Sequence, residues 1–566
     1  MSKRIYILFG VIIVFFTAVR CGAVSSARKA QLNNHSAAYC DEKNNPGKLF
    51  SKGISYEDSA DTVIISDCLR YDEPLVEAVR RVNSGGVIVI DSDVYHHNNQ
   101  YIEITKTLTI KGKGDATIYV DNKENAQTGP FIYAHSDNDI TLTIQDVTID
   151  GRRYGKTEGA DRNRLFEIVR CDFILRNCTI QNMHYASAFG IGGQSEFISV
   201  LQYEYCEISD CTFRRINTQI EGIYLKPVYD LYEGAANRPK ELIDANNHKT
   251  ANDFAYIHNN KFLADTRFDY EKSEVSFADP NEYVSSWLGI FDGRCEFSGN
   301  YISGSAGSSV HLHVYDSKIE GNTFMPTLNS GVSINMNEYG FPYGFIPFRD
   351  TIRNNIFKNT NDCIQCDYGY DILIEGNTFE REYKLSPNDK RSNRFLVMRA
   401  KSPYYADRKI KNFTIRDNQL NDIRNFIEWN QQQLEVDGLS IEGNKVKLAD
   451  EYNRGMIAFD FVPSIANVTI KNNEFDFGAY VYLGKVYSVK KIEEPSLISY
   501  GLKGSQKIKN LSVEDNIFQR KGETKRFAII NYRDYHGSEG TPDLPKSQGI
   551  VVRKNKSADG TAILLK

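Results

Sequence analysis

The chain has 566 residues, a formal net charge of −5 and 41% hydrophobic residues. Lysine and arginine are interspersed with aspartate and glutamate rather than gathered into a basic stripe, which argues against a protein that binds nucleic acid through its phosphates. A chain of this length can bury a large core, so its 10 cysteines are not needed as a disulfide framework.

The N-terminus predicts export. Lys3 and Arg4 precede an uninterrupted apolar run over residues 5–19, which is typical of a signal peptide and short for a membrane span. An uncleaved N-terminal anchor is the alternative interpretation. We therefore expect a signal peptide over residues 1–21, an N-terminal extension over residues 22–60, and a secreted, periplasmic or cell-surface protein.

Cys21 raises the question of a lipid anchor. A bacterial lipoprotein carries its lipid on the cysteine that follows the signal peptide, and Cys21 stands at that place. Small residues precede the cysteine in that pattern, whereas Arg20 precedes it here. A lipid anchor at Cys21 therefore stays an open alternative.

A short amphipathic helix is expected at about residues 72–84, at the start of the folded part. Its signals are Asp72 as N-cap, Pro74 in the first turn, an apolar face of Leu75, Val79 and Val82, and Gly85 and Gly86 after its end. Strands with alternating apolar residues follow it directly, first GVIVID and then TLTIKGKG.

One short phrase recurs from the middle of the chain to its end. It consists of an apolar-polar-apolar strand, a small turn that ends in asparagine, and then a polar and an apolar residue. The turn residues are Asn177, Asp210, Asn260, Asn300, Asn322, Asn355, Asn377, Asn418, Asn444, Asn473, Asn516 and Asn555, with aspartate replacing asparagine once. The closest of them lie 22 residues apart, and longer gaps fit one rung plus an insertion, or two rungs.

A period of this size indicates stacked supersecondary units, because one unit cannot bury its apolar face alone. One rung per period places each strand about 4.8 Å from its equivalent in the next rung, in a parallel sheet. The predicted fold is therefore all-β, a right-handed parallel β-helix over residues 61–566 whose open end is covered by the helix. The turn asparagine is expected to take left-handed φ and to hydrogen-bond to the equivalent turns above and below.

The sequence leads to three predictions about the cysteines. Cys178 and Cys211 each follow the turn residue of their rung, so they should lie one above the other as a buried thiol stack. Cys40 and Cys68, near the cap, are the pair most suited to a disulfide. The C-x-x-C motif at residues 363–366 should hold no metal and do no redox chemistry, because residues three apart on a strand point to opposite faces.

These features together resemble the pectate-lyase-like superfamily of right-handed parallel β-helix proteins. The resemblance rests on the cap helix, the VIVI strand, the LTIKGKG phrase and the repeated G-N-x-F rungs, and it covers residues 60–566. It implies an exported carbohydrate-active enzyme that cleaves a polysaccharide, either a polysaccharide lyase or a glycoside hydrolase. A non-catalytic glycan-binding protein, adhesin or tailspike-like protein on the same fold is the alternative.

The working face is expected along the third strand of each rung, because long insertions adjoin this strand. They span residues 227–254, 264–286, 338–350 and 485–508. Long loops on a rigid scaffold commonly carry function. The aromatic residues of the third insertion suit either stacking on sugar rings or a local hydrophobic lid, and deletion of the fourth is expected to leave the coil folded.

Alternation along the third strand predicts the direction of each side chain. The expected inward residues are Val310, Leu312, Val314, Val332, Ile334, Met336, Ile364 and Cys366, and the expected outward residues are His311, His313, Ser333, Asn335, Asn337, Gln365 and Asp367. Asp292 and Arg294 end the strand one rung earlier, and Arg399 and Glu428 continue the outward column. Because outward positions are taken as exposed, His313→Ala and Asn335→Ala should leave stability nearly unchanged.

This outward column supplies the candidate site. The predicted catalytic residues are His311, His313, Asp292, Arg294 and Asp367, and the predicted substrate-binding residues are Asn335, Asn337, Tyr339, Lys226, Arg399 and Glu428. In a lyase, a histidine or Tyr339 would abstract the proton beside a carboxyl group that Arg294 neutralises. In a hydrolase, two carboxyls would act, drawn from Asp292, Asp316, Glu338 and Asp367.

A competing cluster lies in the segment QIEGIYLK. Glu221 and Lys226 resemble the glutamate and lysine of the chondroitinase B and alginate lyase family, in which lysine is the base and carboxylates bind calcium. This chain departs from that pattern, because Gln219 stands where a second glutamate would help bind calcium and no R-H-G phrase follows. No cofactor is required by the sequence, and Ca²⁺ enters only through this resemblance to a lyase.

Overall fold

The structure is a computed structural model that describes residues 60–564 with gaps. The gaps are residues 98–100, 121–129, 137–138, 153–163, 186–195, 228–252, 265, 270–273, 280–281, 329–330, 337–346, 383–392, 399–407, 431–433, 451–454, 461, 479–480, 484–488, 492–494, 502–506, 522–525 and 534–548. The expected signal peptide, Cys21 and Cys40 lie outside the described residues, so the lipid anchor and the Cys40–Cys68 disulfide stay predictions. Among the residues that are described, no helix is both long and apolar enough to cross a membrane.

Each rung contributes one strand to sheet A and two strands to a second, folded sheet. In the described part of the chain, sheet A has 17 strands: β1 (Ala60–Ile64), β2 (Val82–Ile90), β5 (Leu108–Gly112), β8 (Thr141–Gln145), β11 (Asp172–Arg176), β14 (Tyr205–Ser209), β16 (Phe254–His258), β21 (Cys295–Ser298), β24 (Lys318–Glu320), β27 (Thr351–Arg353), β30 (Gly369–Tyr370), β31 (Leu373–Glu375), β34 (Arg408–Arg416), β37 (Leu434–Glu442), β40 (Ser464–Lys471), β45 (Lys507–Glu514) and β48 (Val551–Arg553).

The second sheet has 29 strands within the same described ranges and consists of two rows, which join in β15 (Thr212–Lys226). Row B contains β3 (Val94–His96), β6 (Thr117–Val120), β9 (Thr148–Asp150), β12 (Thr179–Tyr185), the first part of β15, β17 (Lys261–Leu263), β22 (Tyr301–Ser303), β25 (Thr323–Phe324), β28 (Ile356–Lys358), β32 (Thr378–Glu380), β35 (Gln419–Ile423), β38 (Lys445–Leu448), β41 (Glu474–Asp476), β46 (Ile517–Gln519) and β49 (Lys556–Ser557). Row C contains β4 (Ile102–Ile104), β7 (Ile132–His135), β10 (Phe166–Val169), β13 (Ile198–Leu201), the last part of β15, β20 (Tyr283–Gly293), β23 (Val310–Val314), β26 (Val332–Asn335), β29 (Asp362–Gln365), β33 (Arg394–Met398), β36 (Asn425–Asn430), β39 (Gly455–Asp460), β44 (Ser496–Gly501), β47 (Arg526–Arg533) and β50 (Ala562–Leu564).

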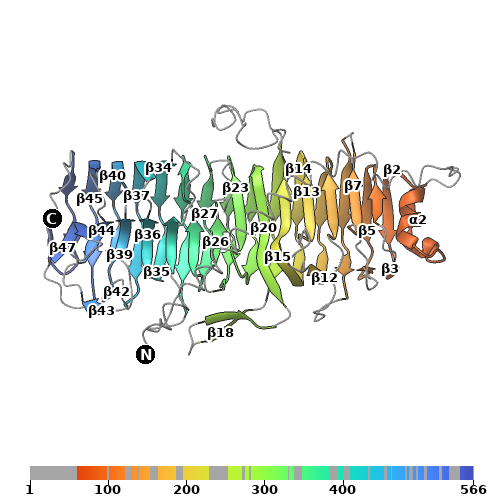
Figure 1. The fold of residues 1–566 in the computed structure, drawn as a ribbon, viewed down its shortest axis with the longest axis horizontal. Coiled ribbons are helices and arrows are strands. Elements are labelled where there is room, and N and C mark those ends of the chain that lie inside the picture. The colour runs from red at the N-terminus through yellow and green to blue at the C-terminus, as the bar shows by residue number, and fades with distance from the viewer. Residues whose placement is uncertain are drawn as a thin grey trace, which may run out of the picture. The chain divides into compact units, whose positions relative to one another are not determined.

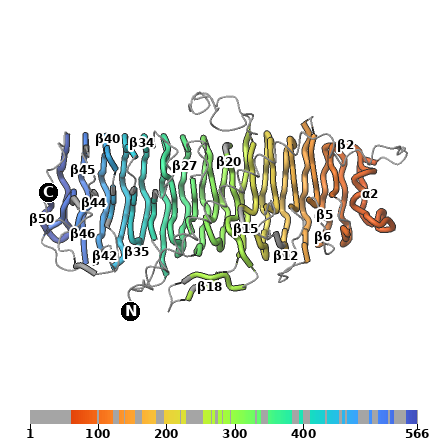
Figure 2. The backbone as a smooth tube through the Cα atoms, in the orientation of Figure 1, coloured from red at the N-terminus to blue at the C-terminus, as the bar shows by residue number. Residues whose placement is uncertain are grey.

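Successive rungs lie side by side along the coil, from the helix α2 (Pro74–Arg81) to β50 (Figure 1). The chain returns to the same three rows once per rung, as the tube trace shows (Figure 2). Pairing between rungs is parallel in all three rows, for example between Val310 of β23 and Ile334 of β26. The fold is therefore the right-handed parallel β-helix that the repeat predicts, with α2 at its N-terminal end.

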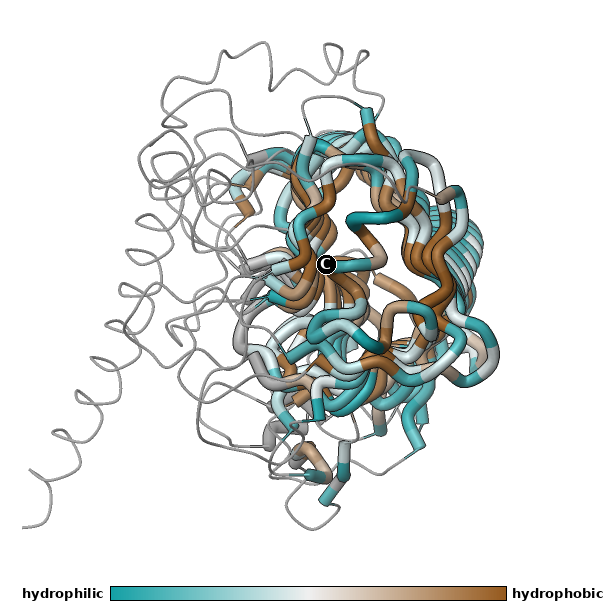
Figure 3. The backbone as a smooth tube through the Cα atoms, turned by 90° about the vertical axis from the view of Figure 1, so that its right-hand side faces the viewer, coloured by the Kyte–Doolittle hydropathy of each residue, from teal (hydrophilic) through white to brown (hydrophobic). Residues whose placement is uncertain are grey.

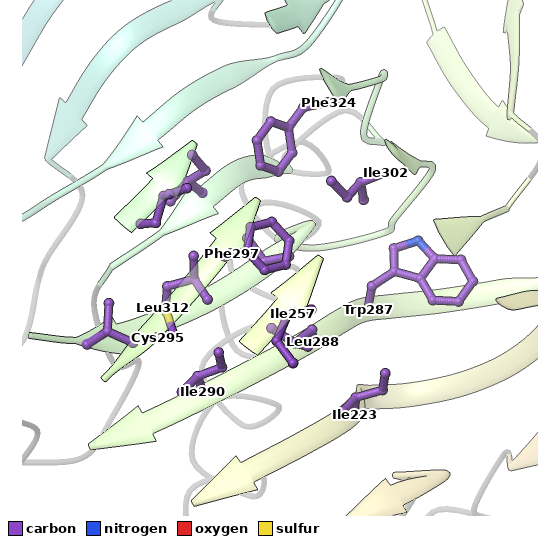
Figure 4. Packing of buried hydrophobic residues seen from close by; sticks show 14 of the residues in the cluster. Ile223, Ile257, Trp287, Leu288, Ile290, Cys295, Phe297, Ile302, Leu312 and Phe324 are labelled. Atoms are coloured by element: carbon purple, nitrogen blue, oxygen red, sulfur yellow. The ribbon is translucent and has the colours of Figure 1, made fainter. Parts of the chain in front are cut away.

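The apolar core lies inside the coil, between the three rows (Figure 3). Figure 4 shows how it is filled, with Ile223, Leu288, Ile290 and Leu312 from row C, Ile257, Cys295 and Phe297 from sheet A, and Ile302 and Phe324 from row B. The predicted inward residues of row C belong to this core, with one exception. Val332 is buried but stands outside the core cluster, because it occupies the first position of its strand, where the chain still turns.

The cap helix begins later than predicted. α2 starts at Pro74 with Glu73 at the N-cap position, rather than Asp72, and no side chain caps it. Leu75 and Val79 are buried against the end of the coil, as the apolar face predicts. The absence of a side-chain cap is tolerable because Pro74 in the first turn has no backbone N–H that needs a partner.

The end of the cap helix also differs from the prediction. Val82 already begins β2, and both glycines that were expected to end the helix lie within that strand. Gly86 allows close packing against β1, since a Cβ there would lie 2.7 Å from the carbonyl oxygen of Asp61, whereas Gly85 has φ 81° and open space around it. The two glycines therefore serve a tight strand approach and a left-handed turn of the backbone, and not a helix C-cap.

A ladder of asparagine side chains runs through the turns between sheet A and row B. At each step, the Oδ1 of one asparagine accepts hydrogen bonds from the backbone N and the Nδ2 of the asparagine in the preceding rung; for Asn355 and Asn377 both distances are 3.0 Å. The ladder joins Asn260, Asn300, Asn322, Asn355, Asn377, Asn418, Asn444, Asn473, Asn516 and Asn555. The predicted ladder is confirmed from Asn260 onward.

The predicted left-handed φ is confirmed at Asn177 and Asp210 but is wrong for the ladder asparagines, because from Asn260 onward it belongs to the residue before the asparagine. Asn259, which precedes Asn260, has φ 56°, and Asn177 and Asp210 have φ 47° and 54°. These three residues are equivalent, because Cys211 N donates to the Oδ1 of the first ladder asparagine at 2.9 Å. The ladder positions of the two earlier rungs are therefore held by cysteines.

Cys178 and Cys211 form the predicted stack. The backbone N of Cys178 lies 3.5 Å from the Sγ of Cys211, and both side chains are buried. Each thiol also lies near a carbonyl oxygen of the preceding rung, as Cys211 Sγ does at 3.5 Å from the oxygen of Leu175. The thiols thus take the place of the asparagine amide as both donor and acceptor, with the weaker hydrogen bonds of sulfur.

Cys211→Asn is expected to extend the ladder by one rung and to raise the free energy of unfolding by about 1 kcal/mol. The new amide would donate to the oxygen of Leu175 and accept from Cys178 N, as the ladder asparagines do. Chemical denaturation midpoints would measure the change. Cys206→Asn, at a fully buried strand position outside the ladder, is the control and should be destabilising. A destabilised Cys211→Asn would contradict the ladder argument.

The insertions have different structures. In the segment 264–286, β18 (Thr266–Asp269) and β19 (Glu274–Phe277) form an antiparallel hairpin beside the coil (Figure 1). Residues 228–252 and 337–346 lie outside the described part of the chain. In the remainder of the third insertion, Phe348 is buried and its ring stacks on Tyr315 at 5.2 Å. This contact favours the hydrophobic-lid interpretation for Phe348.

The expectation that the coil folds without residues 485–508 is wrong. This segment contains β44, which lies in row C between β39 and β47 and buries Leu497 and Ile498. The additional length is partly a second antiparallel hairpin of β42 (Val481–Leu483) and β43 (Val489–Lys491). Sequence spacing merged this hairpin with a rung strand, because both alternate apolar and polar residues.

Candidate functional site

Strand pairing aligns the outward side chains of row C into columns along the coil. The central column consists of Ser199, Tyr224, Gly289, His311, Asn335, Gln365, Val397 and Glu428, one residue in each rung. An edge column at the start of the strands contains Glu221, Ser286, Val332, Asp362, Arg394 and Asn425. We call these two columns, with the Lys226, Phe291 and His313 positions beside them, the row-C face.

A histidine and a glutamate from different rungs meet on this face. His311 Nδ1 lies 2.7 Å from Glu221 Oε1, although the two residues are 90 positions apart in the sequence. The glutamate side chain is 5% exposed and the histidine side chain 21% exposed. Glu221 therefore binds one ring nitrogen inside the protein, while the ring remains partly accessible from outside. The structure thus joins the two site hypotheses that the sequence analysis kept apart.

Gly289 makes this contact possible because it stands between the two residues in the intervening rung. A Cβ at Gly289 would lie 2.4 Å from the ring of Phe291 and 2.9 Å from Cγ of Glu221. Any side chain at this position would displace the glutamate or the phenylalanine. The glycine is therefore a requirement of the Glu221–His311 pair.

Aromatic rings lie beside the Glu221–His311 pair, toward the C-terminal ends of the row-C strands. Phe291 stacks on Tyr224 with ring centroids 5.0 Å apart, and the ring of His313 meets Phe291 edge-on at 5.0 Å. His313 lies 6.5 Å from His311 between ring centroids. Its side chain is buried, so among the described histidines of this face His311 is the better placed to meet a ligand.

Amide and carboxyl groups continue the face beyond the histidines. Asn335 Nδ2 donates to Ser308 Oγ at 3.2 Å, and Gln365 Nε2 donates to Asp367 Oδ2 at 3.4 Å. The Oε1 of Gln365 is buried and has no hydrogen-bond partner among the described residues. A buried acceptor without a partner is costly in free energy.

The outward residues are more buried than predicted. His313, Ser333, Asn335, Gln365 and Asp367 are each at most 2% exposed. Alternation predicts the direction of a side chain but says nothing of what lies over it. The expectation that His313→Ala and Asn335→Ala leave stability nearly unchanged therefore loses its basis, because both substitutions would empty buried space.

An ion-paired arginine lies further along the face, and the sequence analysis missed it. Arg394 donates through Nε and Nη2 to Asp362 at 3.0 and 2.8 Å, and through Nη1 to Glu428 at 2.7 Å. All three residues are buried. The predicted substrate-binding residue Glu428 is thus held by an arginine of the neighbouring rung. Asp362 and Arg394 begin their strands at the corner between rows, where a strict alternation pattern does not identify outward residues.

Arg294 lies just past the end of β20, and Gly293 before it pairs with Val314 of the histidine strand. The Nε of Arg294 donates to the carbonyl oxygen of Asp253 at 3.2 Å, in the turn that leads into sheet A. Burial raises the pKa of Asp253 to about 6, and the Arg294 guanidinium acts in the opposite direction. Asp292 belongs to β20 at a register shift, and its side chain lies outside the described part. The predicted role of Arg294 beside His311 and His313 stays a prediction.

The structure describes some of the remaining predicted site residues and not others. Lys226 is the last residue of β15 and lies on the row-C face. Because Leu225 pairs with Ile290, Lys226 stands next to Phe291 of the following rung. Asp316, considered as a hydrolase carboxyl, binds Arg349 in the exposed turn after β23. Asn337, Glu338, Tyr339 and Arg399 lie outside the described residues, so their roles stay predictions.

A calcium site of the kind that the lyase resemblance implies does not fit the residues at Glu221. One oxygen of this carboxylate accepts the hydrogen bond of His311, and the neighbouring position in β20 is Ser286 rather than a carboxylate. Within the described ranges, no group of three or more histidine, cysteine, aspartate or glutamate residues is arranged to hold a metal ion. Cys363 and Cys366 are both fully buried, and burial raises the pKa of each thiol.

A shallow groove of about 410 Å³ lies on the outer side of row B. It is lined by Thr378, Phe379, Glu380, Gln419, Leu420, Asn421, Lys445, Val446, Lys447, Glu474, Asp476 and Gln519. Lysines and carboxylates alternate along it and pair with one another, as Lys445 and Glu474 do at 3.4 Å. The pairing is typical of a solvated sheet surface, so the row-C face is the stronger candidate.

Neither a protein-family model nor a curated protein sequence matches this chain. Among solved structures it is similar to PfbA, a surface adhesin of Streptococcus pneumoniae, with 12% identity, a TM-score of 0.44 and coverage of 74% of this chain and 94% of that chain. It is similar to the alginate lyase AlyF-OU02 with 17% identity, a TM-score of 0.38 and coverage of 80% and 90%.

A tailspike protein of E. coli bacteriophage HK620, solved as a mutant in complex with a pentasaccharide, is similar with 10% identity, a TM-score of 0.36 and coverage of 81% and 72%. At these identities the likeness is one of fold. The function of this chain is therefore argued from its own site.

Proposed function

We propose that this protein binds a uronate-containing polysaccharide along the row-C face and cleaves it by β-elimination, with His311 as the general base. The observation that carries the proposal is the 2.7 Å contact between His311 Nδ1 and Glu221 Oε1. A buried carboxylate that binds one imidazole nitrogen fixes the tautomer of the ring and leaves the other nitrogen as the proton acceptor.

The proposed step removes a proton from one carbon and breaks the glycosidic bond at the next. His311 Nε2 removes the proton on the carbon beside the uronate carboxyl group, and the electrons of that C–H bond form a carbon–carbon double bond. The glycosidic C–O bond at the next carbon breaks, and its oxygen takes a proton from water. His311 then returns its proton to solvent. Glu221 stabilises the imidazolium that forms in between, because its carboxyl oxygen contacts Nδ1 of the ring.

Elimination fits the described residues better than hydrolysis does. Hydrolysis needs two carboxyls that are free to act as acid and base. Asp316 is held by Arg349, and Asp367 is buried and accepts from Gln365. Elimination instead needs a base and a positive charge that opposes the substrate carboxylate, and Lys226 stands on the same face as His311.

The proposal places the protein outside the cytoplasm, where polysaccharides of this kind are met. This location depends on the signal peptide that is expected over residues 1–21. A lipid anchor at Cys21 would hold the enzyme at a cell surface, and without it the protein would be secreted or periplasmic.

A panel of uronate-containing and neutral polysaccharides tests the proposal, with unsaturated products and new reducing ends assayed in parallel. Unsaturated ends that appear with each new reducing end support β-elimination. New reducing ends without unsaturation would make the protein a glycoside hydrolase instead. Tight binding with neither product would favour the non-catalytic glycan-binding protein or adhesin.

A further inference from the structure

A second group of aromatic and ionisable side chains lies on row C, near the N-terminal end of the coil. His135 Nε2 lies 2.8 Å from Glu103 Oε1, and each of these side chains is 36% exposed. The ring of Tyr133 stacks on that of His135 at 4.6 Å, and Tyr101 meets Tyr133 edge-on at 5.5 Å. These four residues, which we call the distal cluster, are not used by the proposed chemistry.

The distal cluster belongs to the same column as the proposed base. Strand pairing leads from Tyr133 to Glu167, Ser199, Tyr224, Gly289 and His311, one rung at each step. Tyr133 and His311 are thus five strand spacings apart, which is about 24 Å along the coil. A ligand that follows the column from one to the other must be an extended polymer.

The chemistry of the cluster suits one pyranose unit. Aromatic rings offer a flat apolar surface to the C–H face of a sugar at low cost in conformational entropy. The Glu103 carboxylate accepts hydrogen bonds from ring hydroxyls, and its contact with His135 holds it in place. The side chains of Glu103 and His135 are more exposed than those of Glu221 and His311, so the cluster is open to a ligand.

We infer that the distal cluster is a binding subsite for a sugar unit of the polymer whose cleavage is proposed at His311, and that the enzyme acts within long chains. This inference rests on the proposed function and adds the length of substrate that the protein recognises. Affinity should rise as an oligomer grows, and rise again when it becomes long enough to reach from His311 to Tyr133.

Size-fractionated oligouronates, from dimers to decamers, are the probe. Dissociation constants would be measured on the full chain carrying His311→Ala, so that the oligomers stay intact. In that background, Tyr133→Ala should remove the last rise in affinity, a loss of about threefold to tenfold for the longest oligomers, and leave the shortest unchanged. Tyr133→Phe keeps the ring and should behave like the parent.

The matched control is Tyr256→Ala. The ring of Tyr256 lies 4.2 Å from that of His258 in β16, at a tilted angle, so it is also a tyrosine beside a histidine, but it belongs to sheet A. It should leave all affinities unchanged. A rise with length that survives Tyr133→Ala would overturn the subsite and leave the proposed function standing. Failure of the parent to bind any oligouronate would overturn the proposed function, and the subsite with it.

Discussion

His311→Ala is expected to slow cleavage of the polysaccharide by about 10²-fold to 10⁴-fold, the usual contribution of a positioned general base. Most of the loss should appear in kcat, because the imidazole acts on the proton in the transition state and contributes little to holding the chain. Formation of unsaturated product under saturating substrate measures kcat directly. The variant should also be somewhat less stable, because removal of the imidazole takes the hydrogen bond of Nδ1 from the buried Glu221 carboxyl group.

Glu221→Gln tests the positioning role of the carboxylate. Glutamine can still accept from Nδ1 of His311, but it loses the charge that stabilises the imidazolium. kcat should therefore fall by about 10-fold to 100-fold with little change in KM. A glutamate with a merely structural role would change stability and leave the kcat of the folded variant unchanged.

His258→Ala is the control for both variants. His258 lies in sheet A with a side chain 19% exposed, close to the value for His311, and its nearest carboxylate, Glu207, is 4.0 Å away. Loss of an imidazole of similar exposure on another face should leave kcat unchanged. If His311→Ala turns over substrate at the parental rate, the base is another residue, and Lys226 on the strand of Glu221 becomes the leading alternative.

The architecture was predictable from the sequence because each rung repeats the same local pattern. Asn300 and Asn322 fix the period, and the alternation around His311 and His313 gives the inward and outward directions of row C. Parallel stacking follows, since only one register places every turn asparagine on the next. The repeat therefore carries both the fold and the ladder that joins its turns.

The site was predictable only in part, because rungs are not evenly spaced in sequence. Glu221 and His311 lie two rungs apart in space, but insertions between them separate them by 90 residues. In the sequence, Glu221 and His311 therefore look like two separate candidate sites. Gly289 was the available signal, as a glycine within an otherwise apolar strand indicates close approach of another group.

The burial of the row-C face was not predictable from the alternation pattern. Alternation predicts that Asn335 and Gln365 point outward. Both lie in the central column of the row-C face, yet both are almost fully buried. Long insertions beside a strand determine whether its outer side is covered, and alternation contains no information on them. The ion pair of Arg394 with Asp362 was missed for a related reason, since it forms at a corner where the period-two pattern is interrupted.

Asn377→Ala is expected to lower the free energy of unfolding by about 3–5 kcal/mol, the range for breaking a buried hydrogen-bond network. Asn377 Nδ2 donates to the oxygen of Ile352 and to Asn418 Oδ1, both at 3.0 Å, and its Oδ1 accepts from the backbone N of Asn355. Alanine keeps the turn but leaves a carbonyl and an N–H buried without partners. The midpoint of denaturant unfolding would record the loss.

Asn555→Ala distinguishes the cost of those buried groups from the loss of an asparagine as such. Asn555 ends the described ladder, where it accepts from Asn516 Nδ2 at 2.9 Å and is itself only half-buried. Water can reach the groups that its removal exposes, so we expect a loss of only about 1 kcal/mol. Equal losses for the two variants would mean that the ladder stabilises each turn locally. A much larger loss at Asn377 would mean that its hydrogen bonds couple neighbouring rungs, as the nearest-neighbour view of stacked repeats requires.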